Sequence, residues 1–490
     1  MNDLHINFFK WDKDYKIFYE SCKKILGLKN PQIYFPILSL YIYYHNTKKS
    51  HKVIDLDRRY FVKEILDIRF LKYYNSNSLI QAKIYDNKHK TYSIEPLFCK
   101  CMPLLDPLHF IMNNYNNSLQ RNPLLPSNYN YNTFYKINDM NNSAYIDTFF
   151  GYICSYITMN NINPSFSKYY GSVNGICNKY HYDITEEYDE FKNEKWFYKN
   201  LGELFSIDMY VDESEEESEI SYKSSKSSSS LKSCKSSMSS KSSKSSKSST
   251  SSSMNSDYIC IIKDIPAQYF FIEALDGTLE DFLHGEINID ILLSSIIQIS
   301  FALHLLQKHF LFTHNDLHIN NIMYTKTDKT YLYYKLNNLY FRVPTYGYIF
   351  KIIDFGRSIF TFNNKVFFND TFDRHGEAQG QYTFPNKHLL YITTDKEMIT
   401  PNFNFDLCRL AITILDELKF KDVDEKFIDF IKSLTKGKDD TYLYELDDDF
   451  NMYIEIAKKA NNSRPCEVIK NEIFNKFKVK KKQFPKKSYY

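Results

Sequence analysis

Short runs of apolar residues, separated by turn-forming residues, mark the predicted strands of this 490-residue chain. The runs are rich in Ile, Tyr, Phe and Leu, and most of these residues favour extended backbone. They lie at residues 78–85, 95–105, 258–262 and 268–275. The last run ends at Asp276-Gly277, a turn signal, and we expect a helix from about Thr278 because Glu280 and Asp281 fall in its first turn.

Longer apolar segments have the period of a helix. Residues 289–309 are apolar on nearly every face, which predicts a buried helix. Ser143–Met159 is predicted to be a helix capped by Ser143. Within residues 405–420, the apolar positions 407, 410, 411, 414, 415 and 418 form a helical stripe.

A hairpin is predicted between the buried helix and the stripe. Its strands are residues 331–336 and 339–343, and its turn is Asn337-Asn338, a residue pair that tolerates positive φ. Residues 348–353 then predict a further strand that ends at Asp354.

From about residue 212 to 256 an acidic run is followed by Ser-Ser-Lys repeats with almost no apolar residue. This composition predicts a disordered insertion within a domain. Closing a loop of that length costs on the order of 3 kcal/mol, so a connection between two strands can contain it. A solvated insertion is the simpler interpretation, and a phosphorylated regulatory segment is the alternative.

The overall composition narrows the class of protein. Hydrophobic residues make up 43% of the chain, enough for a sizeable core, while the net charge of +3 gives no field that favours nucleic acid or membrane. Nine cysteines without a C-x-x-C motif suggest neither a zinc site nor a disulfide framework. Since no signal-peptide pattern begins the chain, we expect a cytoplasmic protein with no membrane partner. The lysine-rich tail is interpreted as solvated, with nucleic-acid contact as the alternative.

Two polar segments on either side of the predicted hairpin carry the candidate chemistry. The first is H-N-D-L-H-I-N-N at residues 314–321, of the form H-x-D-L-x-x-x-N, and the second is D-F-G at residues 354–356. Their order, their spacing and the apolar strands beside them argue against a chance match. The alternative is that Asp316 and Asp354 are ordinary loop acids.

These motifs resemble those of protein kinases. In detail the chain is similar to the divergent serine/threonine-protein-kinase-like proteins of giant (nucleocytoplasmic large) DNA viruses, on residues 313–324, 343–347, 351–357 and 405–410. The resemblance covers about residues 75–470. It implies an α+β, bilobal protein-kinase-like fold with the following parts: a mostly helical N-terminal extension (1–72), a small β-rich N-lobe (73–275) containing the insertion, a larger helical C-lobe (276–475) and a basic tail (476–490).

The resemblance also implies roles for residues of the two motifs. Asp316 would accept the proton of the substrate hydroxyl, and Asn321 and Asp354 would bind Mg²⁺. His314 would pack against Phe355 and, together with Phe355 and Gly356, would be structural.

Residues outside the motifs receive roles in the same way. Ile272 would be the gatekeeper, and the backbones of Glu273 and Leu275 would hydrogen-bond adenine. Asp406 would brace the catalytic loop from beneath.

The conserved kinase lysine maps best onto Lys100, a cation that alternates with apolar residues in a predicted strand. Its acidic partner in the following helix would be Asp147. The alternatives are that Lys100 is a solvent-facing strand lysine and that Asp147 is an exposed helix acid.

The chain departs from the kinase pattern at several positions. It has no G-x-G-x-x-G motif, so a phosphate lid would need bulkier backbone, or nucleotide binding would be weak. Asn315 replaces the arginine that anchors a phosphorylated activation loop, which predicts activity independent of that switch. His318 stands where serine/threonine kinases have a lysine, and no A-P-E motif follows D-F-G. Arg464 resembles a late C-lobe arginine whose usual glutamate partner is not identifiable.

The leading hypothesis is therefore an ATP-dependent and Mg²⁺- or Mn²⁺-dependent protein kinase that phosphorylates Ser/Thr hydroxyls of a protein substrate. One alternative is a small-molecule kinase of the aminoglycoside or choline type, whose loops also contain D-L-H followed by Asn. Another is a pseudokinase that serves as a scaffold or nucleotide-binding module. The substrate, the activation mechanism and the oligomeric state stay open.

Overall fold

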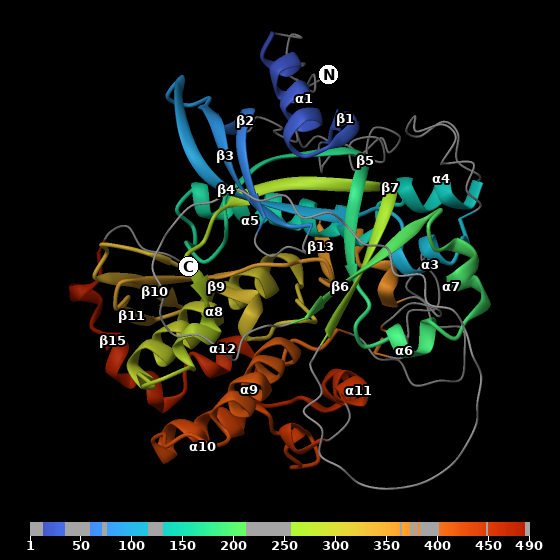
Figure 1. Cartoon of the computed structure of the whole chain (residues 1–490). Helices are drawn as coiled ribbons and strands as arrows, with labels where there is room; N and C mark the ends of the chain where they lie inside the picture. The colour runs from blue at the N-terminus through green and yellow to red at the C-terminus, as the bar shows by residue number, and fades with distance from the viewer. Residues whose placement is uncertain are drawn as a thin grey trace, which may run out of the picture.

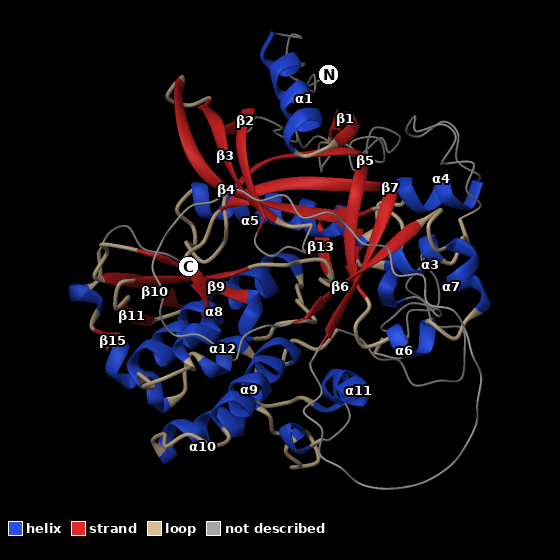
Figure 2. Ribbon diagram, in the orientation of Figure 1, coloured by secondary structure: helices blue, strands red, loops and turns tan. Residues whose placement is uncertain are grey.

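The computed structural model describes residues 13–34, 59–70, 76–115, 131–211, 256–362, 365–372, 378, 381–382, 401–446 and 449–485. Helices and sheets both occur in these residues, which confirms the α+β class (Figure 1). In the orientation of Figure 2, the long strands lie in the upper part of the molecule, and helices α8 to α12 lie in the lower part.

The described strands are β1 (Leu28–Ile33), β2 (Tyr60–Phe70), β3 (Ser78–Asp86), β4 (Thr91–Pro103), β5 (Tyr169–Asp183), β6 (Phe205–Val211), β7 (Ser256–Glu273), β8 (Gly277–Thr278), β9 (Ile322–Lys326), β10 (Tyr331–Leu336), β11 (Leu339–Pro344), β12 (Tyr348–Ile352), β13 (Phe360–Phe362), β14 (Lys365–Phe367) and β15 (Lys478–Val479). The described helices are α1 (Lys13–Ile25), α3 (Pro107–Ile111), α4 (Tyr131–Asn138), α5 (Ser143–Met159), α6 (Tyr188–Phe191), α7 (Lys195–Asn200), α8 (Ile289–Phe310), α9 (Phe405–Leu418), α10 (Glu425–Leu434), α11 (Asp449–Lys459) and α12 (Pro465–Val468).

The main sheet has seven strands in the order β1-β5-β7-β4-β3-β2, with β6 paired to β7. All of its pairings are antiparallel, so neighbouring strands are linked without parallel crossovers. Three smaller sheets follow in the second half of the chain: β10-β11-β15, β12-β9-β8 and β13-β14.

Two large groups of buried apolar side chains form the core. One joins α1 to the inner face of the main sheet, and the other surrounds α8 and α9. Helix α5 contributes to both, because Ala144 and Tyr145 belong to the first group and Phe149 and Phe150 belong to the second. This helix therefore connects the sheet to the helical part of the molecule.

Helix α8 confirms the prediction of a buried helix at residues 289–309. It is long and apolar enough to cross a membrane. However, 78% of its most apolar 18-residue segment is buried inside the protein, as in a core helix. Asn288 caps its first turn by accepting hydrogen bonds from the backbone N–H groups of Asp290 and Ile291.

Most other predicted elements are present with small shifts. The hairpin forms β10 and β11 with Asn337 at φ 52°, and the predicted helix at 405–420 is α9. Helix α5 begins at Ser143 as predicted, but its cap is Asn142, whose side chain accepts a hydrogen bond from Ala144 N. The segment after Thr278 makes only a 3₁₀ turn, Leu279–Phe282, rather than an α-helix.

The two strands predicted at 258–262 and 268–275 are a single strand, β7. One half of β7 pairs with β6 and the other half pairs with β4, while β5 pairs along both halves. Asp264 in the middle has φ 54°, a local irregularity that bends the strand between its two sets of partners. The polar and proline residues between the two apolar runs therefore mark a bend and not an end.

The N-terminal residues are less helical than predicted. Within 13–34 and 59–70 there is one helix, α1, while β1 and β2 are strands of the main sheet. Gly175 of β5 permits the close approach of β1, since a Cβ atom at this position would lie 2.6 Å from Leu28 Cδ1. The apolar residues of this region are therefore used by the sheet rather than by a separate helical unit.

The insertion predicted at 212–256 lies outside the described residues except for Ser256, which begins β7. On either side of it, Val211 of β6 is the register partner of Ser256. The intervening 44 residues, 212 to 255, thus form the connection of an antiparallel hairpin.

Replacing residues 212–255 by a four-residue turn should preserve the fold and raise the free energy of unfolding by roughly 2 kcal/mol, because a shorter loop loses less entropy on closure. Urea denaturation followed by circular dichroism measures this change. A Gly/Ser linker of the original length is the control and should leave stability unchanged. A large loss of stability with both replacements would show that the native segment packs on the fold.

Candidate functional site

The loop at residues 314–321 is held from below by Asp406, the second residue of α9. His314 N donates to both carboxylate oxygens of Asp406 at 3.0 Å, and Asn315 N donates to Oδ1 at 3.0 Å. Asp406 is fully buried, and this burial raises the pKa of its carboxyl group. The sequence prediction placed Asp406 beneath this loop, and these three bonds show how it holds the backbone.

The D-F-G segment lies directly against the same loop. Ile353 N donates to Asn321 O at 3.1 Å, and His314 Nε2 contacts Ile353 O at 2.9 Å. The ring of His314 lies 5.8 Å from the ring of Phe355, so the expected contact between these side chains is present. Asp354 follows β12 with φ 62°, a left-handed conformation that turns its side chain out of the strand direction.

Lys100 joins two acidic side chains from distant parts of the chain. Its Nζ lies 2.7 Å from Asp147 Oδ2 of α5 and 2.9 Å from Asp354 Oδ1. The other oxygen of Asp147 accepts a hydrogen bond of 2.8 Å from Phe355 N. The structure thus brings Asp354 to the pair of Lys100 and Asp147 that the resemblance implied. We call these three residues the ion cluster.

The exposed fractions decide between the alternatives for Lys100 and Asp147. The side chain of Lys100 is 17% exposed and that of Asp147 is 2% exposed, so neither is a solvent-facing surface residue. The side chain of Asp354 is 43% exposed, and it is the part of the ion cluster that solvent or a ligand can reach.

The three charges shift one another's titration. Burial alone would lower the pKa of Lys100, but Asp147 and Asp354 outweigh it and raise this pKa above its usual value. Burial raises the pKa of Asp147, against the attraction of Lys100. Burial of Asp354 alone would raise the pKa of its carboxyl group, but the charge of Lys100 outweighs this effect and lowers the pKa. Lys100 and Asp354 are therefore both charged at neutral pH.

Asn321 is oriented by two contacts of its amide nitrogen. Nδ2 donates to Asp316 O at 2.9 Å and lies 2.9 Å from His318 Nε2. Burial lowers the pKa of His318, and its Nδ1 atom accepts a hydrogen bond of 3.3 Å from Asn320 N. The sequence prediction missed this contact between His318 and Asn321.

The residues fit a hard divalent cation. Asp354 offers a charged carboxylate that is partly exposed, and Asn321 offers an amide oxygen. Mg²⁺ and Mn²⁺ prefer such oxygen ligands. In the described residues no group of three His, Cys, Asp or Glu side chains has the arrangement of a metal site made by the protein alone. A cation here would be shared with another oxygen-rich ligand.

Asp316 has a partner that the sequence did not reveal. Tyr453 of α11 donates a hydrogen bond of 2.7 Å from its hydroxyl to Asp316 Oδ1. Only the fold brings these residues together, since they are far apart in the sequence and no motif includes Tyr453.

The residues assigned to adenine binding lie at the end of β7. Ile272 is the partner of Phe98 on β4, and Glu273 is the last residue of the strand. The carboxylate of Glu273 accepts a 2.7 Å bond from Lys351, whose side chain is only 4% exposed. Leu275 follows the strand and is partly exposed. The gatekeeper and adenine-binding roles stay predictions.

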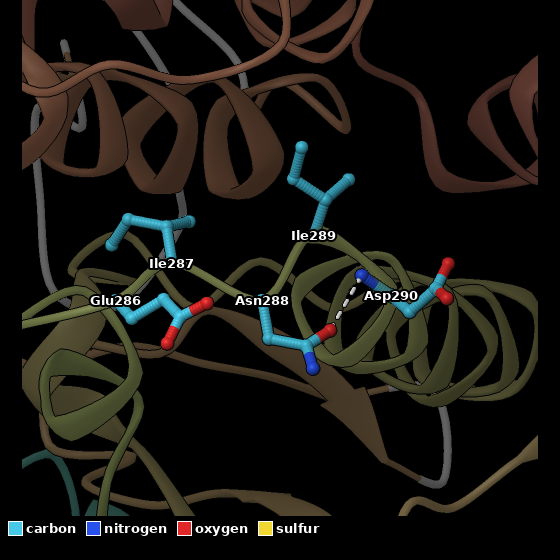
Figure 3. A pocket seen from close by; sticks show the side chains of 5 residues that line it. All are labelled: Glu286, Ile287, Asn288, Ile289 and Asp290. Carbon is cyan, nitrogen blue, oxygen red and sulfur yellow. Dashed lines mark hydrogen bonds between the residues drawn. The ribbon is translucent and has the colours of Figure 1, made fainter.

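A separate hollow of about 480 Å³ lies at the start of α8 (Figure 3). It is lined by residues 286–290, and the bond from Asp290 N to Asn288 Oδ1 is the helix cap already described. None of its lining residues belongs to the ion cluster or to the loop at 314–321. It has no part in the chemistry considered for that site.

Comparisons with known proteins add one local sequence likeness. No family model matches the chain. Over 111 residues the chain is 36% identical to a Dictyostelium discoideum protein described as a probable serine/threonine-protein kinase; the match covers 21% of this chain and 9% of that protein. Among solved structures, the ROP18 kinase domain in complex with AMP-PNP and sucrose aligns over 90% of this chain and 92% of that chain, with a TM-score of 0.30 and 9% identity. So low a score carries no argument about the fold.

The local identity supports the protein-kinase-like resemblance found in the motifs. The chain spans about a tenth of the length of this relative, so the activity of the whole relative does not transfer to it. The narrower similarity to giant-virus proteins stays a prediction.

Substituting Lys100 by Met should lower the free energy of unfolding by about 3 kcal/mol at pH 7.5, because it leaves Asp147 buried without its counter-charge. The pKa of Asp147, already raised by burial, then rises further. The folded variant takes up a proton that the unfolded chain does not bind, so the deficit relative to wild type should shrink as pH falls from 8 to 5. Urea denaturation at several pH values measures it.

Lys83→Met on the neighbouring strand β3 is the matched control, since Lys83 forms no ion pair within the described residues. We expect it to change stability by less than about 0.5 kcal/mol at every pH. A deficit for Lys100→Met that does not depend on pH would contradict the assignment of Asp147 as the residue left uncompensated.

Proposed function

We propose that this chain is an ATP-dependent protein kinase that transfers the γ-phosphoryl group to a Ser/Thr hydroxyl of a protein substrate. The observation that carries the proposal is the ion cluster of Lys100, Asp147 and Asp354, packed against the loop that contains Asp316 and Asn321. A lysine paired with a helix acid beside a metal-binding aspartate is the arrangement that phosphoryl transfer requires of a kinase. The local identity to a protein described as a serine/threonine kinase supports the same class.

The residues of the proposed site would serve two purposes, neutralising phosphate charge and accepting a proton. Lys100 is a cation fixed by Asp147, and it can offer its charge to phosphate oxygens. Asp354 and Asn321 would hold Mg²⁺ or Mn²⁺, which supplies neutralisation of the phosphate charge when it is bound. Asp316 would accept the proton of the attacking hydroxyl.

The support beneath the loop determines where these groups lie. Asp406 holds the backbone of His314 and Asn315, and Ile353 holds the backbone of Asn321. The proton acceptor and both metal-binding groups are therefore fixed to one continuous set of buried hydrogen bonds. Such preorganisation contributes to rate because little reorganisation is needed during the reaction.

The chain also has an arrangement consistent with activity without loop phosphorylation. The side chain of Asn315 donates to Arg357 O at 3.0 Å and accepts a hydrogen bond from the hydroxyl of Tyr382. Asp370 forms an ion pair with Lys136 of α4. Parts of the segment after D-F-G are thus held by uncharged hydrogen bonds and by one protein carboxylate, where other kinases use a phosphate.

Asp316→Asn should lower kcat by about 10²- to 10⁴-fold while leaving ATP binding unchanged, because it removes the proton acceptor and no charge that contacts nucleotide. The assay is transfer from [γ-³²P]ATP to generic protein substrates with Mg²⁺ or Mn²⁺. Asp328→Asn, an exposed acid in the turn between β9 and β10, is the matched control and should retain full activity.

Three outcomes would contradict the proposal, each in a different way. A wild-type protein that binds no nucleotide and transfers nothing is not a kinase. A protein that binds ATP without transfer in either metal is a pseudokinase. Labelling of a metabolite in place of any protein would identify a small-molecule kinase.

Treatment with a protein phosphatase should leave kcat of the wild-type protein unchanged within about twofold, because no phosphate is needed where Asn315 and Lys136 make the contacts. Mass spectrometry of the treated protein verifies that phosphate has been removed. A large loss of activity, restored by autophosphorylation, would show that the segment depends on a phosphate after all.

A further inference from the structure

We propose that Tyr453 and Arg409 form a positioning pair that orients the carboxylate of Asp316 toward the substrate hydroxyl. This inference rests on the proposed function, since it concerns the orientation of Asp316, the proton acceptor in that reaction. Neither residue belongs to the two motifs, and both are contributed by helices of the second half of the chain.

The first contact is the hydrogen bond from Tyr453 to Asp316. The hydroxyl of Tyr453 donates to Oδ1 at 2.7 Å, the usual length of an O–H···O hydrogen bond. Burial of Tyr453, together with the charge of Asp316, raises the pKa of the phenol, so the hydroxyl keeps the proton that it donates to Asp316. One oxygen of Asp316 is thereby occupied, and the other is left for a substrate proton.

The second contact places a cation over the ring of Tyr453. The guanidinium carbon of Arg409 lies 4.9 Å from the centre of this ring. The Nε atom of Arg409 is buried without a hydrogen-bond partner within the described residues, and the guanidinium group acts on Tyr453. Its charge is therefore directed at Tyr453, which a neighbouring cation makes a stronger hydrogen-bond donor.

Packing holds the ring in place. The ring of Phe405 lies 6.0 Å from that of Tyr453, and both Phe405 and Arg409 are on α9, one turn apart on the same face. Asp406 of the same helix holds the loop backbone on which Asp316 lies. One helix thus fixes the backbone of the loop directly and the side chain of Asp316 through Tyr453.

The loop itself does not provide this function. His314 and His318 each lie two residues from Asp316 in the loop. The ring of His314 contacts Ile353 O and Phe355, and the ring of His318 contacts Asn321 and Asn320 N. The orientation of Asp316 therefore depends on a group from outside the loop. Tyr453 is the residue that the structure places there.

A competing interpretation makes the opposite prediction. A tyrosine hydroxyl bonded to the proton acceptor also has the geometry of an acceptor substrate, so Tyr453 could block the site or be phosphorylated itself. Removing a blocking hydroxyl would raise activity, whereas removing a positioning hydroxyl lowers it.

The test measures kcat, KM and ATP binding for Tyr453→Phe, Arg409→Met and the double variant, with full-length protein. We expect Tyr453→Phe to lower kcat about tenfold or more, and to leave the KM for ATP within about twofold, because only the orientation of Asp316 changes. Arg409→Met should lower kcat by a smaller factor. In the Tyr453→Phe background it should cause no further loss, because it acts through the hydroxyl that is absent.

Two further variants separate positioning from a structural role. Arg409→Lys should recover part of the loss by retaining the charge, and Tyr453→Phe should have no effect on the residual rate of Asp316→Asn. Tyr444→Phe is the control for loss of a hydroxyl, since Tyr444 is a partly buried tyrosine packed against the same apolar cluster as Tyr453. Thermal unfolding of each variant checks that the fold is retained.

The inference is overturned if Tyr453→Phe has the kcat of the wild type, if it is more active, or if mass spectrometry finds phosphate on Tyr453 after incubation with ATP. It is also overturned if the losses of the two single variants add in the double variant. A wild-type protein without transfer activity refutes the proposed function itself, and that result is visible before any variant is compared.

Discussion

The buried position of Lys100 is the constraint on which the site depends. A lysine with 17% of its side chain exposed is stable only if its charge is matched, and here two carboxylates approach it from separate elements. Strand β4, helix α5 and the segment after β12 must therefore meet at one point. An arrangement that separates β4 from α5 leaves Asp147 buried without its counter-charge.

Such a cluster is a poor source of stability, because desolvating three charged groups offsets much of their attraction. The large apolar cores supply the stability, and α5 contributes to both of them. The rings of Phe149 and Phe150 anchor this helix in the core around α8, while Asp147 on the same helix reaches Lys100. The packing of α5 thus holds Asp147 beside Lys100, and Lys100 in turn holds the carboxylate of Asp354.

The sequence predicted those parts of the molecule in which local pattern and final environment agree. The buried helix α8, the hairpin at Asn337 and the strand before Asp354 follow from periodicity and turn chemistry, and tertiary contacts do not override them. Predictions were wrong where a local signal had two meanings. Pro266 and Asp264 are residue types that often end a strand, but in β7 they lie between the half paired with β6 and the half paired with β4. The N-terminal apolar residues fit a helix equally well until β5 provides a sheet edge for β1.

In the candidate site, too, some residues could be predicted from local sequence pattern and others could not. Asp316, Asn321 and Asp354 are adjacent in motifs whose spacing is set by one loop and one strand end, so a linear pattern can identify them. Tyr453 and Arg409 have no such spacing, because their relation to Asp316 depends on how α9 and α11 pack beneath the loop. Positioning groups on separate helices can change without altering the motif. On the proposed function, the motif indicates the class of chemistry, while its efficiency would depend on contacts that only the fold reveals.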